Sequence, residues 1–131
     1  MTWITAPALA LMLREMLDAG DTDGAIRWVT EAVSNLAAAN PKHVPREVIV
    51  RPGSTGDARW DTLLATSFAY AMQVNGGRPA PWMLNATPLA VDWAWGRDGA
   101  SNELIELIRG ETPAVFRSKG ILTRPRDWET W

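Results

Sequence analysis

Cysteine is absent from this 131-residue sequence. Disulfide bonds, thiolate zinc sites, iron–sulfur clusters and cysteine nucleophiles are therefore excluded together. Histidine occurs once, at His43, within the loop-like stretch NPKHVPRE. A serine–histidine triad would need that single imidazole, which is far from any nucleophile elbow, so we interpret it as a surface histidine.

Lysine and long apolar runs are also scarce. Of the 13 basic residues only Lys42 and Lys119 are lysine, and 15 acidic residues give a net charge of −2. No overall positive field therefore draws the chain toward nucleic acid. The apolar run Ile4–Leu13 is too short for a membrane span and has no basic region before it, so neither a signal peptide nor membrane association is expected. Together with the absence of cysteine, this favours a cytoplasmic protein.

Helical periodicity dominates what is present. Residues 1–40 carry apolar side chains at spacings of three and four, with Thr5 as a cap, and are predicted to form an αα-hairpin. Residues 41–56 form a connector in which Val48–Val50 predicts a short extended piece, and residues 57–131 form a helical remainder that begins at the cap Asp57. The predicted fold is a single all-α domain, a bundle of about five helices with irregular Pro- and Trp-rich connectors.

Two of these helices are predicted after residue 100. The first, SNELIELIRG, has Ser101 as its cap. Its apolar residues are expected to point inward; they are Leu104, Ile105, Leu107 and Ile108. The second, ETPAVFRSKG, has Pro113 near its start and ends at Gly120.

Tryptophan is over-represented, with eight copies beside one tyrosine and two phenylalanines. Three of them lie in PAPWMLNATPLAVDWAWG, Pro79–Gly96, whose three prolines prevent one long helix. We therefore expect a crossover made of turns and short helical pieces. Trp82 and Trp93 are expected to anchor this crossover in the core, and Trp95 is expected to face a partner.

Catalytic and metal-binding patterns are weak. Asp18, Asp21 and Asp23 in DAGDTDG lack the glutamate and glycine positions of a calcium loop and are interpreted as helix caps. Gly53–Gly56 has no lysine after it, unlike a phosphate-binding loop. No metal or cofactor is predicted, and an enzyme of unrecognised type ranks last among the functions considered. Its acid–base candidates would be Asp57, Asp61 and Glu103, with Arg59 nearby.

Three segments share an order of residues that resembles a known type of protein: LDAGDTDGAIRWVTEAVSNL, GDARWDTLLATSFAYAMQVNGGRPAPWM and ETPAVFRSKGILTRPRDWE. They are similar to the helical half of actinobacterial and phage proteins described as regulators or antitoxin-like, in which a helix-turn-helix half comes first. The matching positions are Gly56, Asp57, Arg59, Trp60, Asp61, Pro79, Pro81, Pro113, Phe116, Arg117, Gly120 and Ile121. Here the helix-turn-helix half is missing, and Trp82 follows Pro81 directly, which departs from the spacing of that type. The resemblance implies a partner-binding or regulatory role.

The predicted function is therefore a non-enzymatic, antitoxin-like or phage-encoded regulatory module that binds a protein partner, with a second copy of itself as a further candidate. Tryptophan and arginine dominate the energetics of protein interfaces. The predicted partner-binding residues are Trp95, Arg97, Arg117, Arg124, Arg126, Trp128 and Trp131. The alternative is a transcriptional regulator or accessory DNA-binding subunit, in which the arginines near the connector and the C-terminus would contact phosphate.

Overall fold

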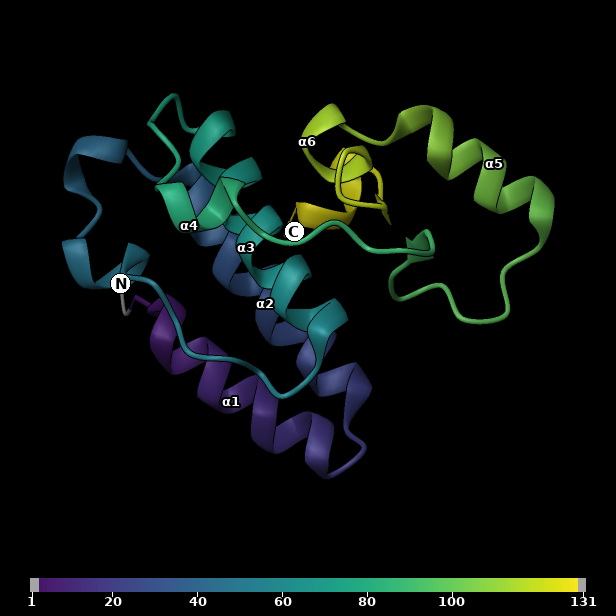
Figure 1. Cartoon of the computed structure of the whole chain (residues 1–131). Coiled ribbons are helices and arrows are strands. Elements are labelled where there is room, and N and C mark those ends of the chain that lie inside the picture. The colour runs from purple at the N-terminus through teal and green to yellow at the C-terminus, as the bar shows by residue number, and fades with distance from the viewer. Residues whose placement is uncertain (1–2, 130–131) are drawn as a thin grey trace.

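The computed structural model describes residues 3–129 (Figure 1). This range contains six α-helices, three short 3₁₀ helices and two two-residue strands, so the prediction of a mostly helical protein is confirmed. In chain order the elements are α1 (Ala6–Asp18), α2 (Thr22–Ala38), η1 (Pro41–His43), η2 (Arg46–Ile49), α3 (Ala58–Val74), α4 (Pro81–Leu84), β1 (Trp93–Ala94), α5 (Asn102–Glu111), α6 (Ala114–Arg117), β2 (Ile121–Leu122) and η3 (Pro125–Trp128). Within residues 3–129, no helix combines the length and the apolar character that crossing a bilayer requires.

Side-chain caps begin the long helices where the sequence predicted them. The hydroxyl of Thr5 accepts a hydrogen bond from the backbone N–H of Ala8 at 3.2 Å, and that of Ser101 accepts one from Leu104 at 3.2 Å. Asp57 accepts from two backbone N–H groups of the first turn of α3. These bonds satisfy donors that have no partner inside the helix.

Helix α3 is the central element, and α1, α2, α4 and α6 pack around it. Every residue from Thr62 to Ala69 is buried, including the ring of Phe68. Small side chains around this helix let neighbours approach on several sides, as expected for a helix in the middle of a bundle. The largest buried side chains that α1 and α2 contribute to the core are Leu9, Leu13, Val29 and Leu36.

The prediction of a short extended piece at Val48–Val50 is wrong. Residues Arg46–Ile49 form the 3₁₀ helix η2, which follows Pro45 with its φ of −60°. A single 3₁₀ turn suffices to insert Val48, which is 1% exposed, into the core beside α1. The β-branched side chains therefore serve packing here, because no neighbouring strand offers a ladder for them to join.

The two strands were not predicted. β1 pairs with β2 in parallel, with Trp93 opposite Ile121 and Ala94 opposite Leu122. The backbone N–H of Trp93 also donates to the carbonyl of Gly120 at 2.8 Å. Gly120 has φ +79°, a conformation in which glycine is favoured, and this bends the chain from α6 into β2. The pairing fastens the crossover after α4 to the C-terminal segment.

Helix α5 stands at the edge of the molecule, at the right in Figure 1. The prediction that Leu107 points inward is wrong, because its side chain is 57% exposed while Ile108 is fully buried. The helix touches β2 along one narrow stripe, and the guanidinium of Arg109 is paired with Asp92 in the crossover. An amphipathic pattern identifies the apolar face, but only a neighbouring element can cover it.

Candidate functional site

Two of the predicted partner-binding residues, Trp95 and Trp128, lie in the interior. Their side chains are 5% and 3% exposed, and their rings stack with centroids 4.8 Å apart and planes 16° from parallel. Phe116 stacks on Trp128 at 5.3 Å. The prediction that Trp95 faces outward is therefore wrong, and Trp128 is buried by its own chain.

The local backbone explains why Trp95 is buried. Trp93 begins β1, and Trp95 lies in the turn that follows it, which the hydrogen bond from the backbone N–H of Arg97 to the carbonyl of Ala94 closes at 3.1 Å. Both rings meet Trp60 edge to face, with centroids at 5.6 Å and 6.3 Å. Trp93 and Trp82 are half-buried and pack against the core, as the sequence predicted for the crossover.

A single hydroxyl connects the buried indoles. Thr123 accepts hydrogen bonds from Nε1 of Trp95 at 3.3 Å and from Nε1 of Trp128 at 3.1 Å. The same hydroxyl donates to Asp127 at 2.9 Å. The polar edge of each indole is thereby satisfied inside the protein, which buried tryptophan requires.

Asp127 gathers two of the predicted arginines. Nη2 of Arg97 lies 2.8 Å from one carboxylate oxygen, and the backbone N–H of Arg124 donates to the other at 3.0 Å. Nε of Arg124 is 3.9 Å from the first oxygen. The carboxylate of Asp127 thus binds the guanidinium of Arg97 and the backbone of Arg124 and holds the segment after β2 in place.

The two remaining predicted arginines are also engaged. Arg126 pairs with Glu111 at 3.7 Å, and Arg117 donates to the backbone carbonyl of Arg109. Trp131 lies outside the described residues. The structure thus brings most of the predicted site together, but as a network that joins the C-terminal segment to the core.

Two of the motif residues that carry the resemblance, Asp61 and Arg59, make contacts within the fold. Asp61 accepts hydrogen bonds from the hydroxyl of Ser54 at 2.7 Å and from the backbone and hydroxyl of Thr55 at 2.7 and 2.6 Å. It fixes the loop before α3 onto the first turn of that helix. Arg59 lies over the ring of Trp93, 4.7 Å from its centroid, in cation–π geometry.

Other chemistry-bearing side chains are dispersed. His43 is exposed in η1, and Glu103 is exposed on α5. Asp21 caps α2 by accepting from the backbone N–H of Gly24 at 2.9 Å, which is the role predicted for it. Over residues 3–129, no three histidine, aspartate or glutamate side chains gather as metal ligands would.

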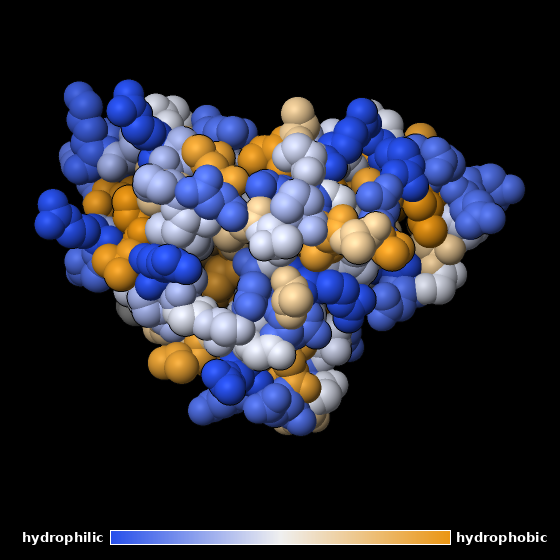
Figure 2. Space-filling model, viewed as in Figure 1, coloured by the Kyte–Doolittle hydropathy of each residue, from blue (hydrophilic) through white to orange (hydrophobic). Residues whose placement is uncertain are grey.

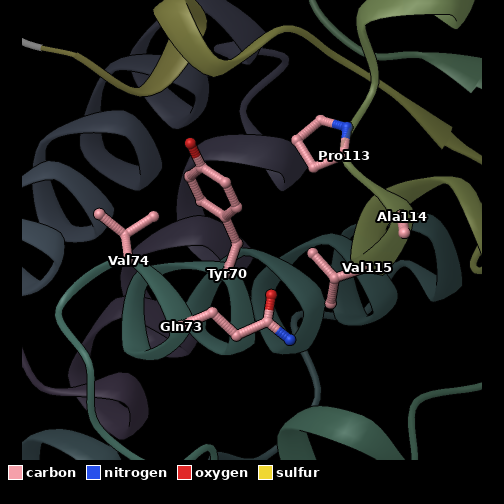
Figure 3. Close-up of a pocket in the computed structure, with 6 residues that line it drawn as sticks. All are labelled: Tyr70, Gln73, Val74, Pro113, Ala114 and Val115. Atoms are coloured by element: carbon pink, nitrogen blue, oxygen red, sulfur yellow. The ribbon is translucent and has the colours of Figure 1, made fainter.

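A shallow notch of about 490 Å³ lies between α3 and the start of α6. Its lining residues are Tyr70, Gln73, Val74, Pro113, Ala114 and Val115. In Figure 3, Tyr70 and Val74 project from α3 on the side from which the α6 segment approaches. Val74 is 55% exposed. Partial burial, and secondarily the charge of Glu129, raise the pKa of Tyr70 above 10.0, so the notch is neutral.

A wider groove of about 850 Å³ is bounded by the loop at residues 51–54, the first half of α3, and the segment from α4 to residue 90. Figure 2 shows the molecule hollowed near the middle of this face. Its lining residues are Arg51, Pro52, Gly53, Ser54, Ala58, Asp61, Thr62, Leu64, Ala65, Pro81, Trp82, Asn85, Ala86, Thr87, Pro88, Leu89 and Ala90. Seven of these seventeen residues are proline or alanine, and each proline fixes its own backbone φ.

Hydrogen bonds fix both walls of the groove. Nε1 of Trp82 donates to the carbonyl of Ile49 at 2.9 Å, which holds the indole against η2. The hydroxyl of Thr62 donates to the carbonyl of Thr87 at 2.8 Å and ties the far wall to α3. Asp61, the acid in the lining, is already occupied by the loop before α3. Both walls of the groove are therefore anchored to neighbouring elements of the fold.

Sequence reasoning missed the groove because its walls come from three separate segments. The signal that existed was the run of small side chains on α3, such as Ala58 and Ala65, which indicates that something can approach that helix closely. Comparison of the chain with known protein families, curated proteins and solved structures finds no match. A function can therefore be inferred only from the residues and geometry of the chain itself.

Proposed function

We propose that this chain is a non-enzymatic protein-binding module whose groove receives a segment of a partner protein. The observation that supports the proposal is the preformed groove of about 850 Å³, with the indole of Trp82 held in one wall. Pockets that bind small molecules have volumes of about 300–1,000 Å³, so a groove of this size has room for a few side chains of a partner segment.

The groove composition favours a peptide segment over a reacting substrate. Pro52, Pro81 and Pro88 present apolar surface without rotatable side chains. A partner that packs on them therefore immobilises few groove side chains, which keeps the entropy cost of binding low. Trp82 offers the kind of aromatic surface around which interface hot spots form. Asn85 and Ser54 add hydrogen-bonding groups at the edge.

The resemblance to the helical half of antitoxin-like regulators supports the regulatory part of the proposal. In this view the chain is an antitoxin-like or phage-encoded regulator, and binding at the groove neutralises or redirects the partner. The α3 and crossover motifs that carry the resemblance then serve to build the groove. Asp61 positions its loop wall, and Pro81 begins the helix that bears Trp82.

Site-specific photo-crosslinking in the producing cells tests this proposal. A photoreactive amino acid at Asn85, in the groove, is expected to give one discrete adduct that mass spectrometry identifies as a partner protein. The same amino acid at Asn102, exposed on α5 and outside the groove, is the matched control and should give no such adduct. Equal adducts from both positions, or none from Asn85, would contradict the proposal.

A steric variant then measures the groove contribution to affinity. Ala90→Trp adds a large side chain in the groove lining, whereas Ala38→Trp adds the same side chain on an exposed position at the end of α2. The first is expected to weaken binding of the purified partner about tenfold or more, because hot-spot contacts are lost at the centre of the interface. The second should leave affinity unchanged. Both should unfold at the urea midpoint of the parent chain.

A further inference from the structure

Half of the large apolar side chains that the fold leaves exposed are chain neighbours of the groove. Among residues 3–129 the exposed ones are Leu11, Val50, Val74, Leu84, Val91 and Leu107. Three of them are next in the chain to residues that line the groove: Val50 to Arg51, Leu84 to Asn85, and Val91 to Ala90. Apolar surface therefore continues from the groove onto its borders.

Two of these side chains, Val50 and Leu84, flank Trp82 and are here named the apolar shoulder. The indole N–H of Trp82 donates to the carbonyl of Ile49 at 2.9 Å, and Val50 is the next residue along the chain. Leu84 ends α4, the short helix that also bears Trp82. The two side chains are 46% and 47% exposed. An occupant that covers Trp82 can therefore bury further apolar surface on the shoulder.

Most polar side chains of the lining already form hydrogen bonds within the chain. Asp61 accepts three from the loop before α3, the hydroxyl of Thr62 donates to the far wall, and the indole N–H of Trp82 donates to η2. Among residues 3–129, the lining side chains whose polar groups bond nothing else in the chain are the exposed Arg51, Asn85 and Thr87. The groove thus offers an occupant few unused hydrogen-bonding groups.

Charge favours neither an acidic nor a basic occupant. The lining holds one cation, Arg51, and one acid, Asp61. The carboxylate of Asp61 is bound by its own loop. Arg51 is exposed, and a charge that pairs with it stays in contact with water and gains little.

We propose that the segment received by the groove is apolar, with aliphatic or aromatic side chains packed on Trp82 and on the apolar shoulder. This inference rests on the proposed function and specifies the chemistry of the partner. A polar side chain placed in the groove would give up its bonds to water without gaining a partner. An apolar side chain loses nothing of this kind and gains by leaving water. Contiguous exposed apolar surface is typical of interaction sites.

Selection from a displayed library of random peptides of about twelve residues tests the inference. Peptides are kept if they bind the full chain but not its Ala90→Trp variant, in which a large side chain is added to the groove lining. The kept sequences should be enriched in leucine, isoleucine, phenylalanine and tryptophan over the unselected library, without enrichment of either charge. Enrichment of acidic or basic residues without apolar ones would overturn the inference.

Calorimetric titration with the most enriched peptide, synthesised without its carrier, then separates apolar from ionic binding. Its affinity should change less than about twofold between about 50 and 500 mM salt, and binding should have a negative heat-capacity change. Glutamine in place of the apolar residues of the peptide should weaken it at least about tenfold. Glutamine in place of its charged residues should change affinity less than about twofold. The reverse order of these two effects would overturn the inference.

Matched leucine variants test the apolar shoulder. Leu84→Ser is expected to weaken the peptide about fivefold, because apolar surface that the peptide would cover is removed. Leu107→Ser makes the same change on α5, which contributes no residue to the groove lining, and should alter affinity less than about twofold. Arg51→Gln should also have less than about a twofold effect. Equal effects of the two leucine variants, or a larger effect of Arg51→Gln than of Leu84→Ser, would contradict the proposal.

The two proposals can fail separately. A partner that crosslinks at Asn85, loses affinity steeply with salt and binds Leu84→Ser as tightly as the parent chain would refute the apolar segment and leave the groove as the binding site. Recovery only of peptides that bind the parent and Ala90→Trp equally would refute the groove itself. Self-association of the parent chain that Leu84→Ser abolishes, with no peptide recovered, would make a second copy the occupant and overturn the inference.

Discussion

The hydroxyl of Thr123 is the polar group on which the buried aromatic cluster depends most. It accepts hydrogen bonds from the indoles of Trp95 and Trp128 and donates to Asp127. Thr123→Val replaces this hydroxyl with a methyl group of similar size. The packing of the site is thereby kept while three hydrogen bonds are removed.

The expected loss of stability follows from the groups left without partners. Each buried indole N–H that loses its acceptor costs about 1–3 kcal/mol, and Thr123→Val leaves two of them. Asp127 keeps its bonds to Arg97 and Arg124, so the loss of the hydrogen bond from Thr123 to Asp127 adds little. The new methyl group returns at most about 0.8 kcal/mol by burial. We expect the free energy of unfolding to fall by about 2–4 kcal/mol.

Urea unfolding followed by tryptophan fluorescence measures this change. With an m-value of about 1–3 kcal/mol/M, the midpoint should fall by roughly 1–2 M. Thr66→Val is the matched control, because Thr66 is 1% exposed and its hydroxyl has no hydrogen-bonding partner among the described residues. Removing an unsatisfied hydroxyl should leave stability unchanged or raise it slightly.

The comparison of the two threonines decides the matter. If Thr123→Val unfolds at the parent midpoint, or if both variants lose stability equally, the hydrogen bonds of Thr123 do not hold the cluster together. The stacked rings would then be stabilised by apolar contact alone.

Three further predictions concern the core, the backbone and pH. Trp95→Ala should lower the free energy of unfolding by about 3–5 kcal/mol, and Trp93→Ala should lower it by less, because Trp95 is buried and Trp93 is half-buried. A urea titration in which Trp93→Ala is the more destabilising variant would contradict this. Gly110→Ala, which meets open space within α5, should stabilise the protein by about 0.5–1 kcal/mol. Gly120→Ala, at φ +79°, should destabilise it by about 1–2 kcal/mol, and thermal melts of the two variants should shift in opposite directions. The raised pKa of Tyr70 means that the unfolded chain loses this proton first, so stability should fall as pH rises above 10.0; Tyr70→Phe should remove part of that fall.

The starts of the long helices could be predicted because their signals are local. A cap such as Thr5, Asp57 or Ser101 bonds to a backbone N–H two or three residues away, and the apolar period repeats every three or four residues. Such contacts depend on neighbours in the chain. Sequence alone therefore determined that this protein is mostly helical and where its main helices begin.

The positions of the tryptophans and the groove depended on distant contacts. Trp95 is buried because β1 pairs with Ile121–Leu122, which places β1 and the turn after it so that both Trp93 and Trp95 contact Trp60. Nothing near DWAWG in the sequence specifies that pairing. Likewise, Leu107 is exposed because no element among residues 3–129 covers that side of α5, although the amphipathic pattern of the helix is intact.

The sequence by itself determined the main helices, their caps and the proline-interrupted crossover. It also excluded reactions that need a cysteine or two histidines. Tertiary structure decided which of those residues are accessible. Arg97 and Arg126 pair with acids of the same chain, whereas Arg51 lines an open groove. Burial and pairing are properties of elements that meet in space, and residues far apart in the chain supply both partners.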